Sequence, residues 1–282
     1  MSIERFIGVD LAWRDEAGSA PANETGVAAL DRRGIVLEAG WTRGVAATVD
    51  WVQEVAGDRS ALLFVDAPLV VENVTGQRVC EQQVGQCYGR WKVSANTTNQ
   101  ASPRRAGVTL LARLQECGWT YHDGRGGPPV DGRLVSECYP YTTLVGVEEL
   151  GYDVQRPRYK RKPRRMPVAQ WRGERAAACD DLIGRLGRLA AADPPMILDS
   201  HPLTAGLAAL PAPIDDAAYK HREDLIDAVL CAWTAALWYR HGQSRCQVLG
   251  AAGDPATAAA TVIAPTRPGQ RITTAVRTGA PR

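Results

Sequence analysis

The chain has 282 residues, a length that suits one large domain or two modest ones with a buried core. Its 45% apolar and 23% charged residues and net charge of +2 exclude a disordered or fibrous protein. No apolar run is long enough to span a bilayer, and we see no secretory signal at the start of the sequence. Seven cysteines without a CxxC pair indicate neither a disulfide framework nor a zinc site. We therefore expect a cytoplasmic protein.

The first half of the chain alternates strand and helix patterns. Residues 5–11 predict a buried strand, and residues 25–30 and 35–39 predict a hairpin. A helix fits 45–56, and a second buried strand covers 61–66. Two antiparallel strands followed by a helix and a parallel strand are typical of a mixed sheet.

The second half carries longer helices. Residues 75–100 predict a short helix and a polar loop, after which Ser102 is expected to cap a helix that ends at Gly118. The further expected elements are a strand (133–139), two helices (167–192 and 219–241) and two short strands (246–249 and 261–264). We therefore expect a single domain over residues 1–264, with a basic insertion at 156–175 and a flexible basic tail at 265–282.

Two aspartates lie on predicted strands. Asp10 sits between Val9 and Leu11 inside the first strand, where an unpaired charge is costly to bury. Asp66 ends the strand whose preceding residues are ALLFV. Either acid alone is slightly better explained as a strand-end residue that caps a turn. Together they favour a site, because neighbouring parallel strands end at the same edge of a sheet.

Two more aspartates share one face of the last long helix. Asp224 and Asp227 are three residues apart, and Asp227 leads directly into the apolar run AVLCAW, so it should lie closer to the sheet. An acidic stripe near the helix N-terminus would explain Asp224 equally well. Glu137, on the strand RLVSECY, is evenly balanced between an ion pair with an arginine and membership of the site.

Converging carboxylates repel one another unless a cation binds them. Oxygen ligands without sulfur or imidazole select Mg²⁺ or Mn²⁺. Two such ions can hold a phosphate, activate water and stabilise the leaving oxygen. We therefore expect Asp10, Asp66, Asp224 and Asp227 to hold metal, with Glu137 as a further catalytic candidate.

The segment 156–175 holds nine Lys and Arg residues and one Glu, a net +8 that leaves the other residues at −6. Tyr159 and Trp171 lie among these cations, a mixture common in nucleic-acid grooves, although a solvated linker has the same composition. The candidate nucleic-acid contacts are Lys160, Arg161, Lys162, Arg164 and Arg165, together with Arg104 and Arg105 at the start of a helix.

Five motifs in order carry a family resemblance: GVDLAW, VDAPL, ECYP, YK within arginine-rich sequence, and EDLIDAVLCAWTA. This order resembles the domain of unknown function 429 family of predicted RNase-H-like nucleases, over most of residues 5–265. The last motif also resembles the C-terminal DxxDA helix of RuvC-type resolvases. The resemblance implies the first-strand role for Asp10, the fourth-strand role for Asp66, and the helix pair for Asp224 and Asp227. RuvC-type enzymes carry Glu at the fourth-strand position, so Asp66 is one methylene shorter.

The leading prediction is an α/β protein, an RNase-H-like mixed sheet flanked by helices, acting as a metal-dependent nuclease. One alternative is an actin-like or sugar-kinase-like phosphotransferase, although the chain has room for one copy of that core and lacks its glycine-rich phosphate hairpins. The other is a non-catalytic nucleic-acid-binding or scaffold protein. By analogy with RuvC-like proteins, a homodimer is possible.

Overall fold

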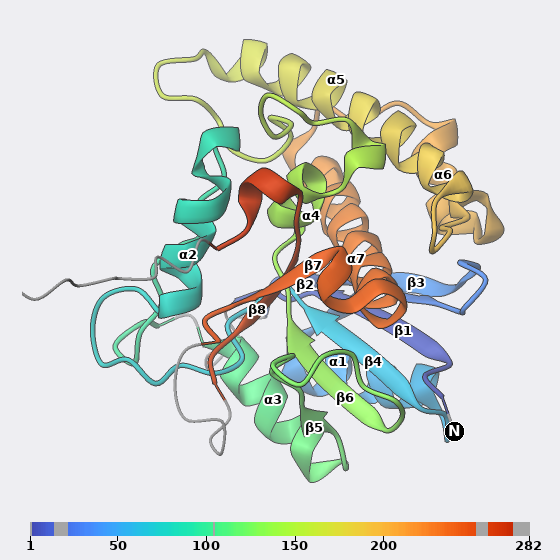
Figure 1. The fold of residues 1–282 in the computed structure, drawn as a ribbon. Helices are drawn as coiled ribbons and strands as arrows, with labels where there is room; N and C mark the ends of the chain where they lie inside the picture. The colour runs from blue at the N-terminus through green and yellow to red at the C-terminus, as the bar shows by residue number, and fades with distance from the viewer. Residues whose placement is uncertain (1, 14–21, 104, 252–258, 273–282) are drawn as a thin grey trace, which may run out of the picture.

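The computed structural model describes residues 2–13, 22–103, 105–251 and 259–272, and a six-stranded mixed sheet lies at its centre (Figure 1). The strands lie in the order β3-β2-β1-β4-β6-β5. Their bounds are β1 Arg5–Asp10, β2 Glu24–Leu30, β3 Val36–Arg43, β4 Ala61–Val65, β5 Thr120–Tyr121 and β6 Arg133–Glu137.

The sheet joins an antiparallel half to a parallel half at β1. Strands β1, β2 and β3 pair antiparallel, whereas β1, β4, β6 and β5 pair parallel. The tight turn between β2 and β3 uses Gly34 at φ 76°, where a side chain would be strained. The predicted α/β class and mixed sheet are confirmed, and the arrangement is consistent with the RNase-H-like fold.

Helices cover both faces of the sheet. α1 (Gly44–Ala56) and α3 (Ala106–Glu116) pack on one face, where alternate β1 residues such as Ile7 and Val9 join their apolar core. The long helix α7 (Asp216–His241) packs on the other face, which receives Phe6. Figure 1 shows α1 and α3 on the side of the sheet away from α5 and α6. Every second residue of β1 therefore faces α7.

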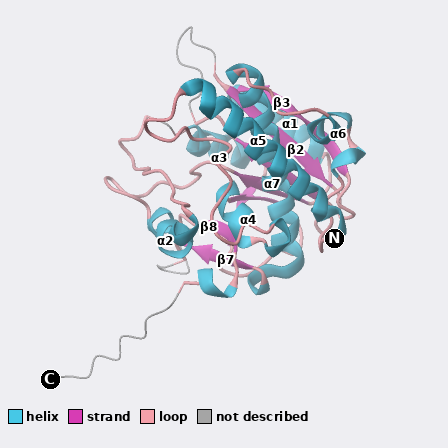
Figure 2. Cartoon of the chain, turned by 90° about the horizontal axis from the view of Figure 1, so that it is seen from above, coloured by secondary structure: helices cyan, strands magenta, loops and turns pink. Residues whose placement is uncertain are grey.

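The remaining elements surround α7. Figure 2 shows β7 and β8 beside α2 and α4, with α5 on another side of the long helix. Their bounds are α2 Val79–Tyr88, α4 Pro140–Gly146, α5 Val168–Leu186, α6 Pro202–Ala209, β7 Cys246–Leu249 and β8 Val262–Pro265. Among the described residues, no helix combines the length and apolar character needed to cross a membrane.

The structure revises one helix start and describes the first part of the predicted tail. Helix α3 begins at Ala106, and Ser102 does not cap it: its hydroxyl instead accepts from the backbone N–H of Asn99 at 3.0 Å. The predicted flexible tail is packed where the structure describes it, because Gln270 is buried and its side-chain amide donates to the carbonyl of Val145 at 3.0 Å. Residues 273–282 lie outside the described part of the chain.

Candidate metal centre

Asp10 and Asp66 come together because their strands are parallel neighbours. Val9 pairs with Val65, and the backbone N–H of Asp66 donates to the carbonyl of Val9 at 2.9 Å, so the two aspartates follow at the same level. Both continue the alternation that places Phe6 in the core under α7. The ends of two adjacent strands thus direct two carboxylates toward the long helix.

The helix can approach β1 closely because Gly8 has no side chain. A Cβ on Gly8 would lie 2.0 Å from the carbonyl oxygen of Ala228, a distance that no real side chain allows. Ala228 directly follows Asp227 in α7. The glycine of the GVD motif therefore allows the helix backbone, and with it Asp227, to lie against the strand that carries Asp10.

Three of the predicted acids form one cluster. Asp10, Asp66 and Asp227 each offer a carboxylate oxygen, and these three oxygens lie within 4.8 Å of one another. All three residues are buried, and Oδ2 of Asp10 has no hydrogen-bond partner. An unpartnered buried carboxylate oxygen is costly unless a cation contacts it. Because the donors are all oxygens, the cluster could hold a hard divalent cation.

The charges of the cluster oppose one another. Burial, followed by the negative charge of Asp10, raises the pKa of Asp66 to about 7. Burial and Asp10 likewise raise the pKa of Asp224 to about 8. A free carboxyl group in water titrates near pH 4. The metal-free site therefore favours protons or cations among its carboxyl groups at neutral pH.

Asp224 lies beside the three-acid cluster and outside it. Its carboxylate pairs with Lys220, one turn earlier on α7, and the same ammonium lies 3.0 Å from Glu223. Asp227, three residues further on, is fully buried and belongs to the cluster. The structure thus agrees with the expectation that Asp227 lies closer to the sheet, and it places Asp224 as a neighbour paired with lysine.

The segment that carries Lys160 enters this site. Oδ2 of Asp227 forms an ion pair with Lys160, and the hydroxyl of the fully buried Tyr159 donates to Oδ1 at 2.6 Å. Burial lowers the pKa of Lys160, but the charges of Asp10 and other acids outweigh it and raise that pKa above its usual value. Lys160, predicted as a nucleic-acid contact, lines the cavity over the cluster and pairs with Asp227. The sequence did not identify Tyr159 as a partner of the acids.

A cavity of about 340 Å³ opens over the cluster. Arg161 lies at this cavity, where its guanidinium donates to the side-chain oxygen of Asn96 at 2.8 Å. The sequence did not single out several of its other lining residues: Trp13, Asn23, Glu24, Asn96, Tyr139, Tyr141 and Lys220. The cavity therefore joins acids, cations and aromatic rings beside the cluster.

The other basic candidates are not among the residues that line this cavity. Lys162, Arg164, Arg165 and Arg105 are exposed, and Lys162 donates to the carbonyl of Met166 at 3.0 Å. Arg104 lies outside the described residues. The predicted basic patch is therefore divided between one half-buried lysine, one arginine at the cavity and a set of surface cations.

Glu137 does not join the acidic cluster. It pairs in register with Val65, one residue before Asp66, and neighbouring residues of a strand point to opposite faces. The residue level with Asp66 is Cys138, which packs in the core under α7. The carboxylate of Glu137 instead receives a two-pronged ion pair from Arg78, at 2.6 and 2.7 Å. Its proposed catalytic role is therefore corrected to an internal ion pair.

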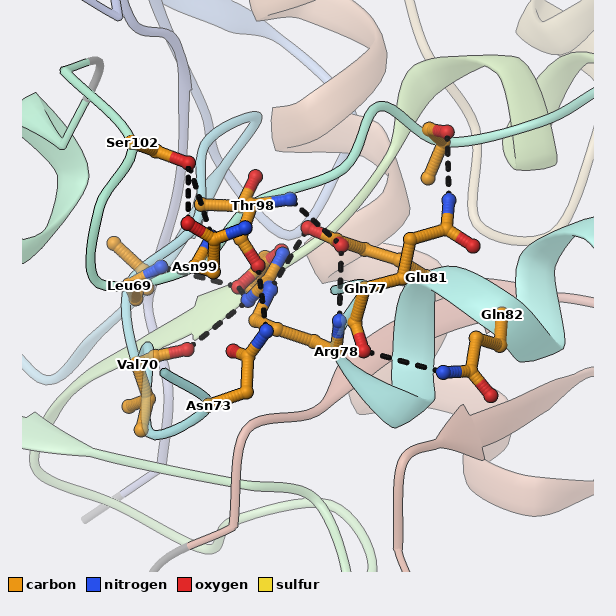
Figure 3. A network of polar contacts seen from close by, with 12 residues as sticks. Leu69, Val70, Asn73, Gln77, Arg78, Glu81, Gln82, Thr98, Asn99 and Ser102 are labelled. Atoms are coloured by element: carbon orange, nitrogen blue, oxygen red, sulfur yellow. Dashed lines mark hydrogen bonds and ion pairs between the residues drawn. The ribbon is translucent and has the colours of Figure 1, made fainter. Parts of the chain in front are cut away.

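Arg78 is the centre of a polar network that connects the segments following Asp66 (Figure 3). Its guanidinium also pairs with Glu81 at 2.9 Å and donates to the carbonyl of Val70 at 3.2 Å. Glu81 in turn accepts from the backbone N–H of Thr98 at 3.0 Å. Glu137 accepts the backbone N–H of Leu69 at 3.1 Å. This network fixes the chain that leaves β4 just after Asp66.

Fold and cluster together define an α/β protein with a buried acidic centre suited to a divalent cation. The chain belongs to the family described as "Protein of unknown function (DUF429)", whose model matches residues 8–251. No curated protein and no solved structure matches it. The homodimer and the cytoplasmic location stay predictions.

Proposed function

We propose that this protein is a metal-dependent nuclease that hydrolyses phosphodiester bonds of nucleic acid at the centre formed by Asp10, Asp66 and Asp227. The observation that carries the proposal is the meeting of three buried carboxylate oxygens within 4.8 Å, one aspartate having an oxygen without a hydrogen-bond partner. Three buried like charges destabilise a fold unless they bind a cation. Their presence together is therefore best explained by a cation that the protein uses.

Bound Mg²⁺ or Mn²⁺ would contact a phosphate oxygen, lower the pKa of water and offset charge on the leaving oxygen. In this chain, Asp10, Asp66 and Asp227 would hold the ion. Tyr159 orients Asp227 by donating to one of its oxygens. No serine or activated cysteine is needed for this hydrolysis, which agrees with the buried state of Cys138 and the raised pKa that burial gives its thiol.

The cavity supports nucleic acid as the substrate class. Lys160 and Arg161 supply positive charge for phosphate, and Trp13 and Tyr139 contribute aromatic surface to the same cavity. Base stacking on aromatic rings beside a basic groove is a common way of binding single strands. DNA, RNA and a small phosphodiester share this chemistry, so the assay must compare them.

The test is cleavage of a substrate panel by the wild-type chain with Mg²⁺, Mn²⁺ or EDTA. The panel contains single-stranded and duplex DNA, RNA, a branched junction and bis-p-nitrophenyl phosphate. We expect cleavage of at least one substrate with metal and none with EDTA. Asp227→Asn should abolish it, Asp224→Asn should reduce it less, and Asp50→Asn, at an exposed position on α1, should leave it unchanged.

Cleavage that resists EDTA, or full activity in Asp227→Asn, would contradict the proposal. Nucleic-acid binding without cleavage under every metal condition would support the scaffold alternative. ATP hydrolysis without phosphodiester cleavage would support the phosphotransferase alternative.

A further inference from the structure

Lys160 places a positive charge among the three carboxylates. Its ammonium pairs with Oδ2 of Asp227, and only 17% of its side chain is exposed. Asp227 itself has no exposed surface. The side chain of Lys160 therefore supplies a positive charge at a cluster of carboxylates whose geometry could also hold a metal ion.

The surroundings hold Lys160 in this position. Its ammonium lies 5.4 Å from the centre of the Tyr141 ring and 5.5 Å from that of Tyr159. Tyr159 is fully buried, and its carbonyl accepts the hydroxyl of Tyr219 at 2.6 Å. Cation–π contacts and a buried neighbouring residue both restrict the side chain. Lys160 is therefore built into the site, unlike the exposed cations that follow it.

The charge of the cluster matches one divalent ion. Asp10, Asp66 and Asp227 carry three formal negative charges, and Lys160 offsets one of them. The remaining charge of −2 equals that of one Mg²⁺ or Mn²⁺ with opposite sign. A second divalent ion would leave a buried excess of positive charge, which is costly. Lys220 pairs with both Asp224 and Glu223 and offsets one of their two charges, so one further negative charge lies beside the cluster. Even with this charge counted, two divalent ions would leave an excess of positive charge.

We propose that the ammonium group of Lys160 takes the place of a second metal ion, so that the centre binds a single divalent cation. This inference rests on the proposed function, and it defines the composition of that same site. Lysine suits the role because its ammonium is a compact point charge with three donors. One donor engages Asp227, and the others are available for a phosphate oxygen in the cavity.

The experiment counts bound metal on the full chain, with Mn²⁺ alone as the probe. Calorimetry gives the number of ions per chain, and electron paramagnetic resonance detects coupling between ions about 3.5–4 Å apart, the spacing of paired metal sites. We expect one uncoupled Mn²⁺ in the wild type. Lys160→Met keeps the length of the side chain and removes the charge, so it should bind two coupled ions.

Lys162→Met is the matched control, because Lys162 is exposed and its ammonium donates to two backbone carbonyls, those of Pro163 and Met166. It should keep one uncoupled ion, as should Lys160→Arg, which retains the charge. If Lys160→Met fails to fold, Lys160→Gln, which also removes the charge, takes its place and should bind two coupled ions.

Two coupled ions in the wild type would overturn the inference and leave the metal-dependent function intact. One ion bound more tightly by Lys160→Met would also overturn it, since Lys160 would then compete with the metal. Absence of Mn²⁺ binding in the wild type would overturn the metal centre and with it the proposed function.

Discussion

Gly26 of β2 lies directly against the backbone of Asp224 in α7: a Cβ at Gly26 would stand 2.0 Å from the carbonyl oxygen of Asp224. Gly26 is also the residue paired with Asp10 across β1 and β2. Because Gly26 has no side chain, the turn of α7 that carries Asp224 can lie close to Asp10. Together with Gly8, this position sets the distance between helix and sheet.

Gly26→Ala should destabilise the protein by at least about 1–3 kcal/mol, because the added methyl group forces α7 away from the sheet. Gly40→Ala is the matched control: Gly40 also lies in the antiparallel half of the sheet, and a Cβ there meets nothing within 4 Å. Urea unfolding of both variants gives the comparison. Equal losses of unfolding free energy would show that the close approach of α7 is unimportant.

The strand aspartates and the helix pair could be predicted from sequence because each belongs to a local pattern. Asp10 and Asp66 follow apolar strand residues, and Asp227 begins the apolar face of a long helix. The parallel pairing of β1 with β4 then brings them together. Local sequence patterns therefore predicted most helices and strands and all three residues of the cluster.

Contacts between distant segments could not be predicted in this way. Arg78 meets Glu137 across 59 residues, and Tyr159 meets Asp227 across 68. Lys160 belongs to a segment so basic that solvent exposure was the natural expectation. The short helices α4 and α6 begin at Pro140 and Pro202, and their few turns give little periodicity. The register of β6 with β4, which the sequence does not give, places Glu137 on the face away from α7.

Glu137→Gln should destabilise the fold by about 3–5 kcal/mol, the usual cost of breaking one partner of a buried ion pair. Glu116→Gln is the control, because its pair with Arg113 is exposed. Denaturant unfolding measures both, and Mn²⁺ affinity of the folded Glu137→Gln protein should stay close to wild type. A stable variant that has lost Mn²⁺ binding would return Glu137 to the metal site.

The metal-free protein should lose stability as pH rises between about 4 and 7. Asp66 releases its proton near its ordinary pKa of 3.8 when unfolded, and burial and Asp10 raise that pKa to about 7 in the folded chain. Folding therefore takes up a proton in this range, so the free energy of unfolding falls as pH rises. Unfolding is measured in EDTA at pH 5 and at pH 7.5. Between these two pH values, the free energy of unfolding should fall by about 1–3 kcal/mol less in Asp66→Asn than in the wild type.

Saturating Mn²⁺ should reverse this trend for the wild type, because metal binds the deprotonated carboxylate. An identical pH dependence in wild type and Asp66→Asn would show that Asp66 titrates normally in the folded protein.

Arg161→Ala should weaken nucleic-acid binding and flatten its salt dependence, by about 0.7–0.9 in log–log slope if one phosphate contact is lost. Arg161 lies at the cavity and contacts Asn96, whereas the control, Arg113→Ala, alters an exposed position of α3 on the other face of the sheet. Titrations in EDTA at several salt concentrations avoid cleavage. An unchanged slope in Arg161→Ala would remove this residue from the binding surface.

Calorimetric titration of Mn²⁺ into wild type, Asp10→Asn and Asp224→Asn tests the central claim most directly. Oδ2 of Asp10 is the buried oxygen without a partner, whereas Asp224 is already paired with Lys220. We expect Asp10→Asn to weaken Mn²⁺ binding at least about tenfold, a loss of about 1.4 kcal/mol, and Asp224→Asn to weaken it less. Equal affinity in the wild type and Asp10→Asn would contradict a metal centre built on Asp10, Asp66 and Asp227.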